Sequence, residues 1–153
     1  GEDHSVALID GDAVRASAHR HLGFSREDIA ENNRLIAERC VDLRAQHDII
    51  VVPIISPYAA DRAAARALLS PKFLEVYCAA NLRCVISRDV KGLYAKAARG
   101  TIPDMIGYSA GSPYEPPTAP ECVLRTDEEP IAVSLMTFVA VVRAELARTT
   151  VVT

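Results

Sequence analysis

Several features that would place the protein in a specialised class are missing from its 153 residues. There is no tryptophan, and the four cysteines (Cys40, Cys78, Cys84 and Cys122) form neither a Cys-x-x-Cys pair nor a zinc-ligand spacing. We therefore expect reduced thiols in a cytosolic protein. The net charge is only −3 at pH 7, so no overall attraction to nucleic acid or to an anionic membrane is expected.

Long hydrophobic runs and a secretory leader are also lacking. The first four residues are polar and acidic, without the apolar segment of a signal peptide. The longest apolar stretch, 131–142, is interrupted by Ser134 and Thr137 and is shorter than the roughly 20 residues that a membrane helix needs. These absences predict a cytoplasmic protein with no membrane partner.

A third absence concerns phosphate binding. No glycine is followed by lysine, so the sequence contains no P-loop of the form G-x-x-x-x-G-K-[ST]. That loop supplies backbone N–H groups, a lysine and a magnesium ligand to nucleoside triphosphates in many kinases.

The residues that are present predict one α/β domain covering 1–153, with a parallel sheet covered by helices on both faces. Half of the residues are hydrophobic, and apolar β-rich runs at 6–9, 49–54, 73–78 and 122–124 alternate with helical patterns.

The helices are predicted from capping and apolar patterns. Ser25 and Asp28 have the spacing of a capping box and open a helix. A second long helix is expected at 131–146, packed on the sheet rather than on a membrane. The proline- and glycine-rich segment 100–120 predicts an ordered loop or lid.

Two acidic residues, Asp10 and Asp12, directly follow the first predicted strand, at the sheet edge where open α/β sheets bind ligands. If the chain stays extended there, both carboxylates point to one side and suit a Mg²⁺ site or proton transfer from a hydroxyl. The alternative is an Asp-Gly turn that only leaves the strand.

Ser56 and Pro57 follow the second predicted strand in the same way and suit the N-cap and first position of a helix. Such a helix start can also hold an anion. Farther along, Arg88, Lys91 and Lys96 belong to a basic cluster that suits phosphate, or else forms a solvated helix face. His19 and His21 are expected at the surface.

Taken together, the motifs occur in a fixed order. They are Asp-Gly-Asp-x-x-Arg (10–15), Leu-Gly-Phe-Ser (22–25), Glu-Asn-x-Arg (31–34), Ile-Ser-Pro-Tyr (55–58), Arg-Asp-x-Lys-Gly-Leu-Tyr-x-Lys-Ala (88–97) and Pro-Tyr-Glu-x-Pro (113–117). This order resembles that of the adenylylsulfate (APS) kinases over about 6–146. The resemblance implies a P-loop kinase-type, doubly wound parallel sheet. It also implies transfer of the γ-phosphoryl group of ATP to the 3′-hydroxyl of APS, which gives PAPS and ADP in sulfate assimilation.

The family's functional positions carry over residue by residue. The resemblance gives catalytic roles to Asp12, Asp10 and Ser56, and makes Asp12 a magnesium ligand. It makes ATP and Mg²⁺ the cofactors, with Arg88 and Lys91 on the cofactor side. The positions that match APS-binding residues are Arg15, Phe24, Asn32, Ile55, Lys91 and Leu93. A homodimer, or fusion to or association with an ATP sulfurylase, is left open.

The sequence departs from the family pattern in two ways. The strand, P-loop and helix that precede the Asp-Gly-Asp strand in the family have no counterpart here, so this chain is expected to be inactive alone. Without that strand, the runs at 49–54 and 73–78 should have open edges or pair directly. In addition, Ile29 replaces an arginine that contacts the APS anion, and Met105 replaces an aromatic residue that stacks on adenine. Two alternatives follow: a non-catalytic nucleotide-binding or interaction module, and a kinase for a related small molecule.

Overall fold

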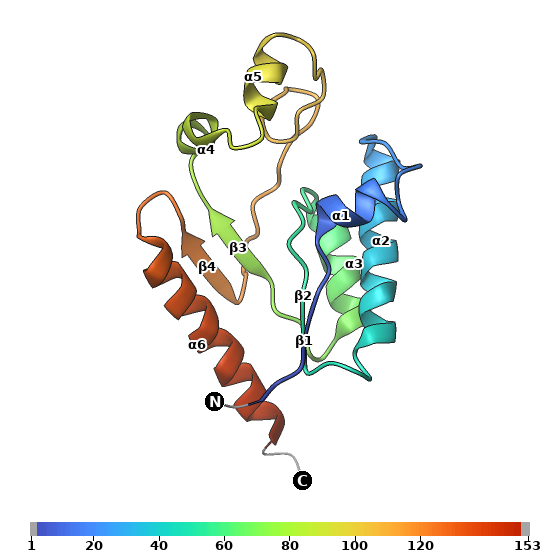
Figure 1. Cartoon of the computed structure of the whole chain (residues 1–153), viewed down its shortest axis with the longest axis vertical. Helices are drawn as coiled ribbons and strands as arrows, with labels where there is room; N and C mark the ends of the chain where they lie inside the picture. The colour runs from blue at the N-terminus through green and yellow to red at the C-terminus, as the bar shows by residue number, and fades with distance from the viewer. Residues whose placement is uncertain (1–2, 151–153) are drawn as a thin grey trace. The chain divides into compact units, whose positions relative to one another are not determined.

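The computed structural model describes residues 3–150, and the chain divides between Phe73 and Leu74 into two compact units. The elements of the first unit are β1 (Val6–Leu8), α1 (Gly11–Ala16), α2 (Arg26–Leu43), β2 (Ile49–Val51) and α3 (Ala59–Leu69) (Figure 1). The elements of the second unit are β3 (Val76–Ala79), α4 (Leu82–Arg88), α5 (Leu93–Ala98), β4 (Cys122–Arg125) and α6 (Ile131–Thr150). All four predicted strands and both long helices are therefore present.

In the first unit, β1 and β2 pair in parallel, with Val6 opposite Ile49 and Leu8 opposite Val51. The start of this ladder is fixed by polar contacts: the backbone N–H and the hydroxyl of Ser5 both donate to the Asp48 carboxylate, at 2.8 and 2.9 Å. Because parallel strands run in the same direction, the segments that leave β1 and β2 emerge at the same edge.

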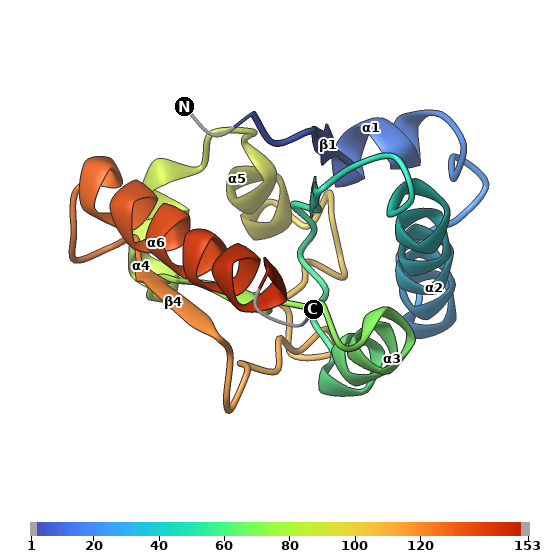
Figure 2. The ribbon, with the colours of Figure 1, turned by 90° about the horizontal axis from the view of Figure 1, so that it is seen from below.

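The core of the first unit lies under α2. Ile9, Val14, Ile36 and Cys40 are all buried and in contact, and side chains from β2 and α3 surround them. Both ribbon views show α2 and α3 lying side by side (Figures 1 and 2). The outer residues of β1 are not covered, because Val6 and Leu8 are 56% and 66% exposed. The expectation that this strand is buried on both faces is therefore wrong for β1.

Helix α2 begins where the sequence predicts. The hydroxyl of Ser25 accepts a hydrogen bond from the backbone N–H of Asp28 at 3.1 Å, which satisfies one of the free donors at the helix start. The buried face of the helix contains apolar residues and also two polar ones, Asn32 and Asn33.

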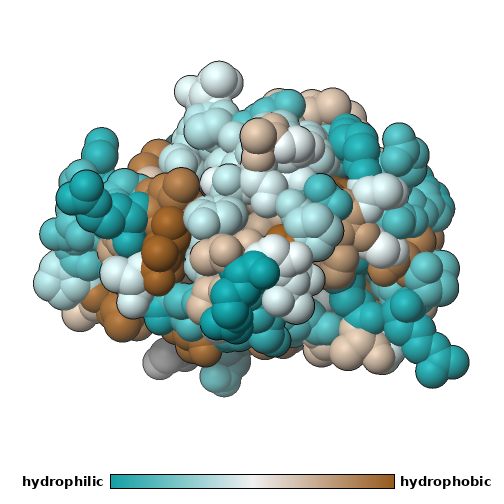
Figure 3. All heavy atoms as spheres, turned by 90° about the horizontal axis from the view of Figure 1, so that it is seen from above, coloured by the Kyte–Doolittle hydropathy of each residue, from teal (hydrophilic) through white to brown (hydrophobic). Residues whose placement is uncertain are grey.

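In the second unit, β3 and β4 also pair in parallel, with Val76 opposite Cys122. Helix α6 packs against β4 (Figure 2), whose Cys122 and Leu124 are buried. The first turns of α6 are more open than expected, since Ile131 is 87% and Leu135 58% exposed. On the face shown in Figure 3, hydrophobic residues lie at the surface among hydrophilic ones.

The parallel pairing agrees with the predicted fold class, but the described residues form two two-stranded sheets instead of one continuous sheet. Within 3–150, β2 pairs only with β1 and β3 pairs only with β4, so each of these strands has one open edge. Open edges were one of the two outcomes expected if no strand lies between them.

The state of the cysteines and the membrane-spanning potential of the helices were also predicted from the sequence. All four cysteines are free, and burial raises the pKa of the Cys40 and Cys122 thiols, which makes them poorer nucleophiles. Within residues 3–150, no helix combines the length and the apolar character that crossing a membrane requires.

Candidate functional site

The candidate site lies at the carboxyl ends of β1 and β2. Beyond the regular strands, the Ile9 N–H donates to the Val51 carbonyl at 2.9 Å and the Gly11 N–H donates to the Pro53 carbonyl at 3.3 Å. The two loops therefore leave the sheet side by side. Gly11 is required by this close approach, because a side-chain carbon there would lie 2.6 Å from Ile54 Cγ2.

The two acidic residues of the first loop have different local roles. Asp10 is the N-cap of α1: its Oδ1 accepts the N–H of Ala13 at 2.9 Å. Asp12 lies in the first helical turn and is exposed. The condition of an extended Asp-Gly-Asp segment is not met, because capping by Asp10 starts a helix at Gly11. Of the two carboxylates, the one that caps α1 is that of Asp10.

An arginine and an aromatic ring form the next part of the site. The Arg15 guanidinium lies 4.7 Å from the centre of the Phe24 ring and donates to the Gly23 carbonyl at 2.8 Å. Burial lowers the pKa of Arg15 below its usual value, and the negative charge of Asp28 partly offsets that change. Phe24 is 65% exposed, so this aromatic side chain offers an accessible surface to a planar ligand.

Asn32 and His19 make a contact that the sequence analysis missed. Asn32 is 3% exposed, and its Oδ1 lies 3.0 Å from Nδ1 of His19. His19 is half-buried by this contact, so the expected surface position is wrong for this histidine. Nothing in the local sequence indicates the pair, because the two residues are brought together by the packing of the first loop on α2.

Ser56 is the residue whose local structure differs most from the prediction. Helix α3 begins at Ala59 with Tyr58 as its N-cap, so Ser56 is not a capping residue. Its φ is 36°, a left-handed conformation that is uncommon for a residue with a side chain. The next residue, Pro57, is fully buried and leaves the loop little room to relax. Ile55, predicted to line the same site, is 57% exposed.

Two contacts hold this second loop to the helices. Nδ2 of Asn33 donates to the Ser56 hydroxyl oxygen at 3.3 Å, and the Arg62 guanidinium donates to the Ser56 carbonyl at 2.9 Å. Arg26 also joins the start of α2 to the start of α3. It forms a two-pronged ion pair with Asp61, at 2.7 and 2.9 Å.

The remaining predicted residues belong to the second unit. Arg88 ends α4 and donates to the Thr126 carbonyl at 2.5 Å. Lys91 is exposed, and Leu93 begins α5 after Gly92. The Asp89 carboxylate accepts the N–H groups of Tyr94 and Ala95 at 3.0 Å each, and these bonds lower its pKa.

The departures from the family pattern have different surroundings. Ile29 is 3% exposed and belongs to the buried face of α2. Met105 is half-buried in the loop that follows α5, and its backbone N–H donates to the Ser109 hydroxyl at 3.0 Å. Burial of Ile29 beside Ile36 and Cys40 on the same helix face favours a role in packing over a position at the edge of a ligand pocket.

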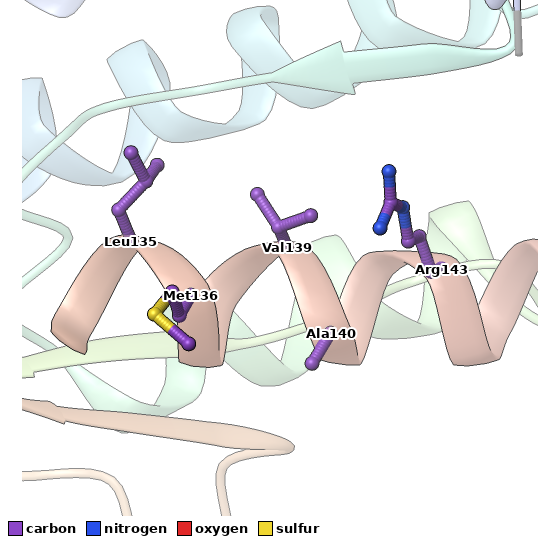
Figure 4. A pocket seen from close by; sticks show the side chains of 5 residues that line it. All are labelled: Leu135, Met136, Val139, Ala140 and Arg143. Carbon is purple, nitrogen blue, oxygen red and sulfur yellow. The ribbon is translucent and has the colours of Figure 1, made fainter. Parts of the chain in front are cut away.

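A hollow of about 370 Å³ lies on α6, away from all of the predicted site residues in sequence. Figure 4 shows that side chains of this one helix line it: Leu135, Met136, Val139, Ala140 and Arg143. A shallow apolar depression with one cation has no chemistry for group transfer. Among the described residues there is also no cluster of three or more His, Cys, Asp or Glu that could hold a metal ion.

Comparisons with known proteins agree on one family. Residues 1–125 match the family model described as adenylylsulphate kinase. The adenylyl-sulfate kinase of Chloroflexus aurantiacus is 49% identical over 125 residues, covering 81% of this chain and 65% of that protein. The adenylyl-sulfate kinase of Acaryochloris marina is 44% identical over 127 residues, covering 82% and 61%. The chain thus spans less than two thirds of the length of these relatives.

A solved structure gives the same result. The APS kinase of Mycobacterium tuberculosis, determined in complex with AMPPNP and APS, is 33% identical to this chain. Its TM-score is 0.80, with 92% of this chain and 81% of that chain covered.

Proposed function

The chain belongs to the adenylylsulphate kinase family, and from that premise we propose that its first unit binds adenylylsulfate. The reaction in which the bound nucleotide takes part is ATP-dependent phosphorylation of its 3′-hydroxyl, with PAPS and ADP as products. A relative of similar structure was solved with APS, which supports this choice of ligand.

The observation that carries the proposal is the pair of contacts by which the inner face of α2 meets the segment after α1, at His19, and the loop after β2, at Ser56. Phe24 presents an exposed ring beside the Arg15 cation, which suits an adenine base and an anionic group. Asn32 and Ser56 add hydrogen-bonding groups from α2 and from the loop after β2. Apolar surface with a few fixed polar groups is typical of small-molecule sites.

Asp12 is the residue that we place at the reacting hydroxyl. Its carboxylate accepts the proton of the 3′-hydroxyl as that oxygen bonds to the γ-phosphorus of ATP, while the bond between the γ-phosphorus and the bridging oxygen of ADP breaks. Asp10 and Asp12 supply the carboxylate oxygens that Mg²⁺ prefers, since this ion usually binds one or two carboxylates plus substrate phosphates. Mg²⁺ contributes charge neutralisation on the phosphates when bound.

The residues that we assign to ATP binding are two cations, without a phosphate-binding loop. Arg88 and Lys91 lie in the second unit and supply positive charge. The sequence has no Gly-Lys pair to wrap the phosphates. The presence of Ile29 and Met105 where the family pattern has an arginine and an aromatic residue favours a second candidate, a nucleotide-binding module that does not catalyse phosphoryl transfer.

Isothermal titration of the chain with APS tests the proposal. We expect one APS per chain, and we expect Asp12→Asn to leave the affinity within about threefold, because Asp12 acts mainly on the proton that moves in the transition state. Val90→Ala, at a 93% exposed position of the second unit, is the control. No saturable heat with APS would contradict the proposed function.

A further inference from the structure

Ser56 is held from several sides in a conformation that it would not adopt by itself. Within residues 3–150, Ser56 and Asp89 are the non-glycine residues with positive φ. Asp89 ends a helix, where this conformation is common, whereas Ser56 lies in a loop between a strand and a helix. Backbone strain of this kind persists only where the surroundings impose it, and it is found preferentially at functional sites.

The surroundings of Ser56 include one polar side chain from another element. Asn33 is 6% exposed on the inner face of α2, and its amide nitrogen donates to the Ser56 hydroxyl oxygen at 3.3 Å. An amide NH₂ group can only donate, so the Ser56 oxygen acts as the acceptor in this bond. The hydroxyl hydrogen of Ser56 must then point elsewhere.

We propose that Asn33 is a positioning residue that sets the direction of the Ser56 hydroxyl, so that this hydroxyl donates to the anionic phosphosulfate group of bound APS. The inference rests on the proposed function, because it requires APS at this site. Two hydrogen bonds to Ser56 support the inference. Arg62 donates to the Ser56 carbonyl, and Asn33 donates to the Ser56 hydroxyl oxygen. The remaining freedom of the side chain is the rotation of the O–H bond, which the Asn33 amide fixes.

A purely structural role for Asn33 gives different expectations. A leucine has a similar volume and could pack on the inner face of α2 without a hydrogen-bonding partner, so the structure would tolerate Asn33→Leu. In that case the substitution would change stability and leave the contribution of Ser56 to ligand binding unaltered. A positioning role of Asn33 therefore requires that the effects of Asn33 and Ser56 substitutions on APS affinity depend on each other, whereas a purely structural role does not.

The test is a double-mutant cycle on the full 153-residue chain, with APS affinity measured by isothermal titration. We expect Asn33→Leu to weaken APS binding about tenfold to hundredfold, as for the loss of one hydrogen bond to a charged group. In the Ser56→Ala background the same substitution should change the affinity by less than about twofold, because the hydroxyl that it orients is absent. Equal weakening in both backgrounds would overturn the inference.

Two further measurements cover a variant that folds poorly. Asn33→Asp keeps the shape but replaces the donor by an acceptor, so the Ser56 hydroxyl should turn toward the carboxylate and APS should bind about tenfold more weakly or worse. Without any ligand, Ser56→Ala should shift the NMR signals of the Asn33 side-chain amide, and unchanged signals would contradict the hydrogen bond itself. If the unaltered chain binds no APS, the proposed function is wrong and the inference falls with it. If the chain binds APS but the cycle shows no coupling, only the inference is wrong.

Discussion

At the scale of single residues, Phe24 combines a fixed position with a large exposed surface. Arg15 lies against its ring, yet the side chain is 65% exposed, so the ring contributes little to the core. We expect Phe24→Ala to weaken APS binding about tenfold, as for loss of one base–aromatic stack, with a melting temperature near that of the unaltered chain. Titration calorimetry and thermal denaturation give the two readings. An unchanged affinity would remove Phe24 from the site.

Ile29 is the residue at which the structure changes the interpretation of the sequence. The family resemblance gives this position to an arginine that contacts the APS anion, but Ile29 is 3% exposed on the inner face of α2. A guanidinium in that place would lose its hydration. We expect Ile29→Arg to lower the free energy of unfolding by about 3 kcal/mol or more.

Urea denaturation measures the effect of Ile29→Arg. Ile29→Val is the matched control, because it keeps an apolar side chain and should cost only about 1 kcal/mol. A stable arginine variant that binds APS more tightly would show instead that this residue lines the ligand site.

At the scale of elements, the start of the β1–β2 ladder depends on one ionised carboxylate. Hydrogen bonds from the backbone and the hydroxyl of Ser5 lower the pKa of Asp48, and His4 adds a smaller effect. A carboxylate whose pKa is lower in the folded state stabilises the fold above its unfolded pKa, and this contribution is lost as the pH falls through the folded pKa.

We therefore expect Asp48→Asn to destabilise the chain by a constant amount above about pH 5, with the difference from the unaltered chain shrinking below about pH 4. Urea denaturation at several pH values measures this difference. Asp42→Asn, on the exposed face of α2, is a matched acidic control. A difference that does not depend on pH would show that Asp48 acts through its shape and not through its charge.

Local signals account for the elements that the sequence predicted well. Ser25 and Asp28 mark the first turn of α2, and the apolar runs mark all four strands. The errors concern features that depend on contacts between segments distant in the sequence. The turn at Ser56 is held by contacts with Asn33 and Arg62 and by the buried Pro57. After β1, the Asp10 side chain caps a helix, so the chain does not continue as an extended strand. The positions that the motif order assigns to an APS site stay predictions.

At the scale of the whole molecule, the two units carry different parts of the expected chemistry. Asp12, Arg15, Phe24, Asn32 and Ser56 belong to the first unit, while Arg88, Lys91 and Leu93 belong to the second. Each unit has a two-stranded parallel sheet, and such small sheets depend on the helices that pack on them. A homodimer and an ATP sulfurylase partner stay predictions of the family resemblance, and a cytoplasmic location stays a prediction from the sequence.

We expect this 153-residue chain to bind APS without phosphorylating it. The side chains that we propose for APS binding are present, but no glycine of these 153 residues is followed by lysine, so they contain no P-loop to stabilise the charge of the transferred phosphoryl group. We expect saturable APS binding together with negligible formation of PAPS or ADP when ATP and Mg²⁺ are added. A coupled assay for ADP and chromatography of the nucleotides measure the products, with a full-length relative as the positive control. Robust turnover would contradict this prediction and would mean that cations of this chain replace the P-loop lysine; loss of the turnover in Lys91→Ala would identify Lys91 as one of them. Without turnover, the same titrations still test the proposed APS site, because saturable APS binding does not require phosphoryl transfer.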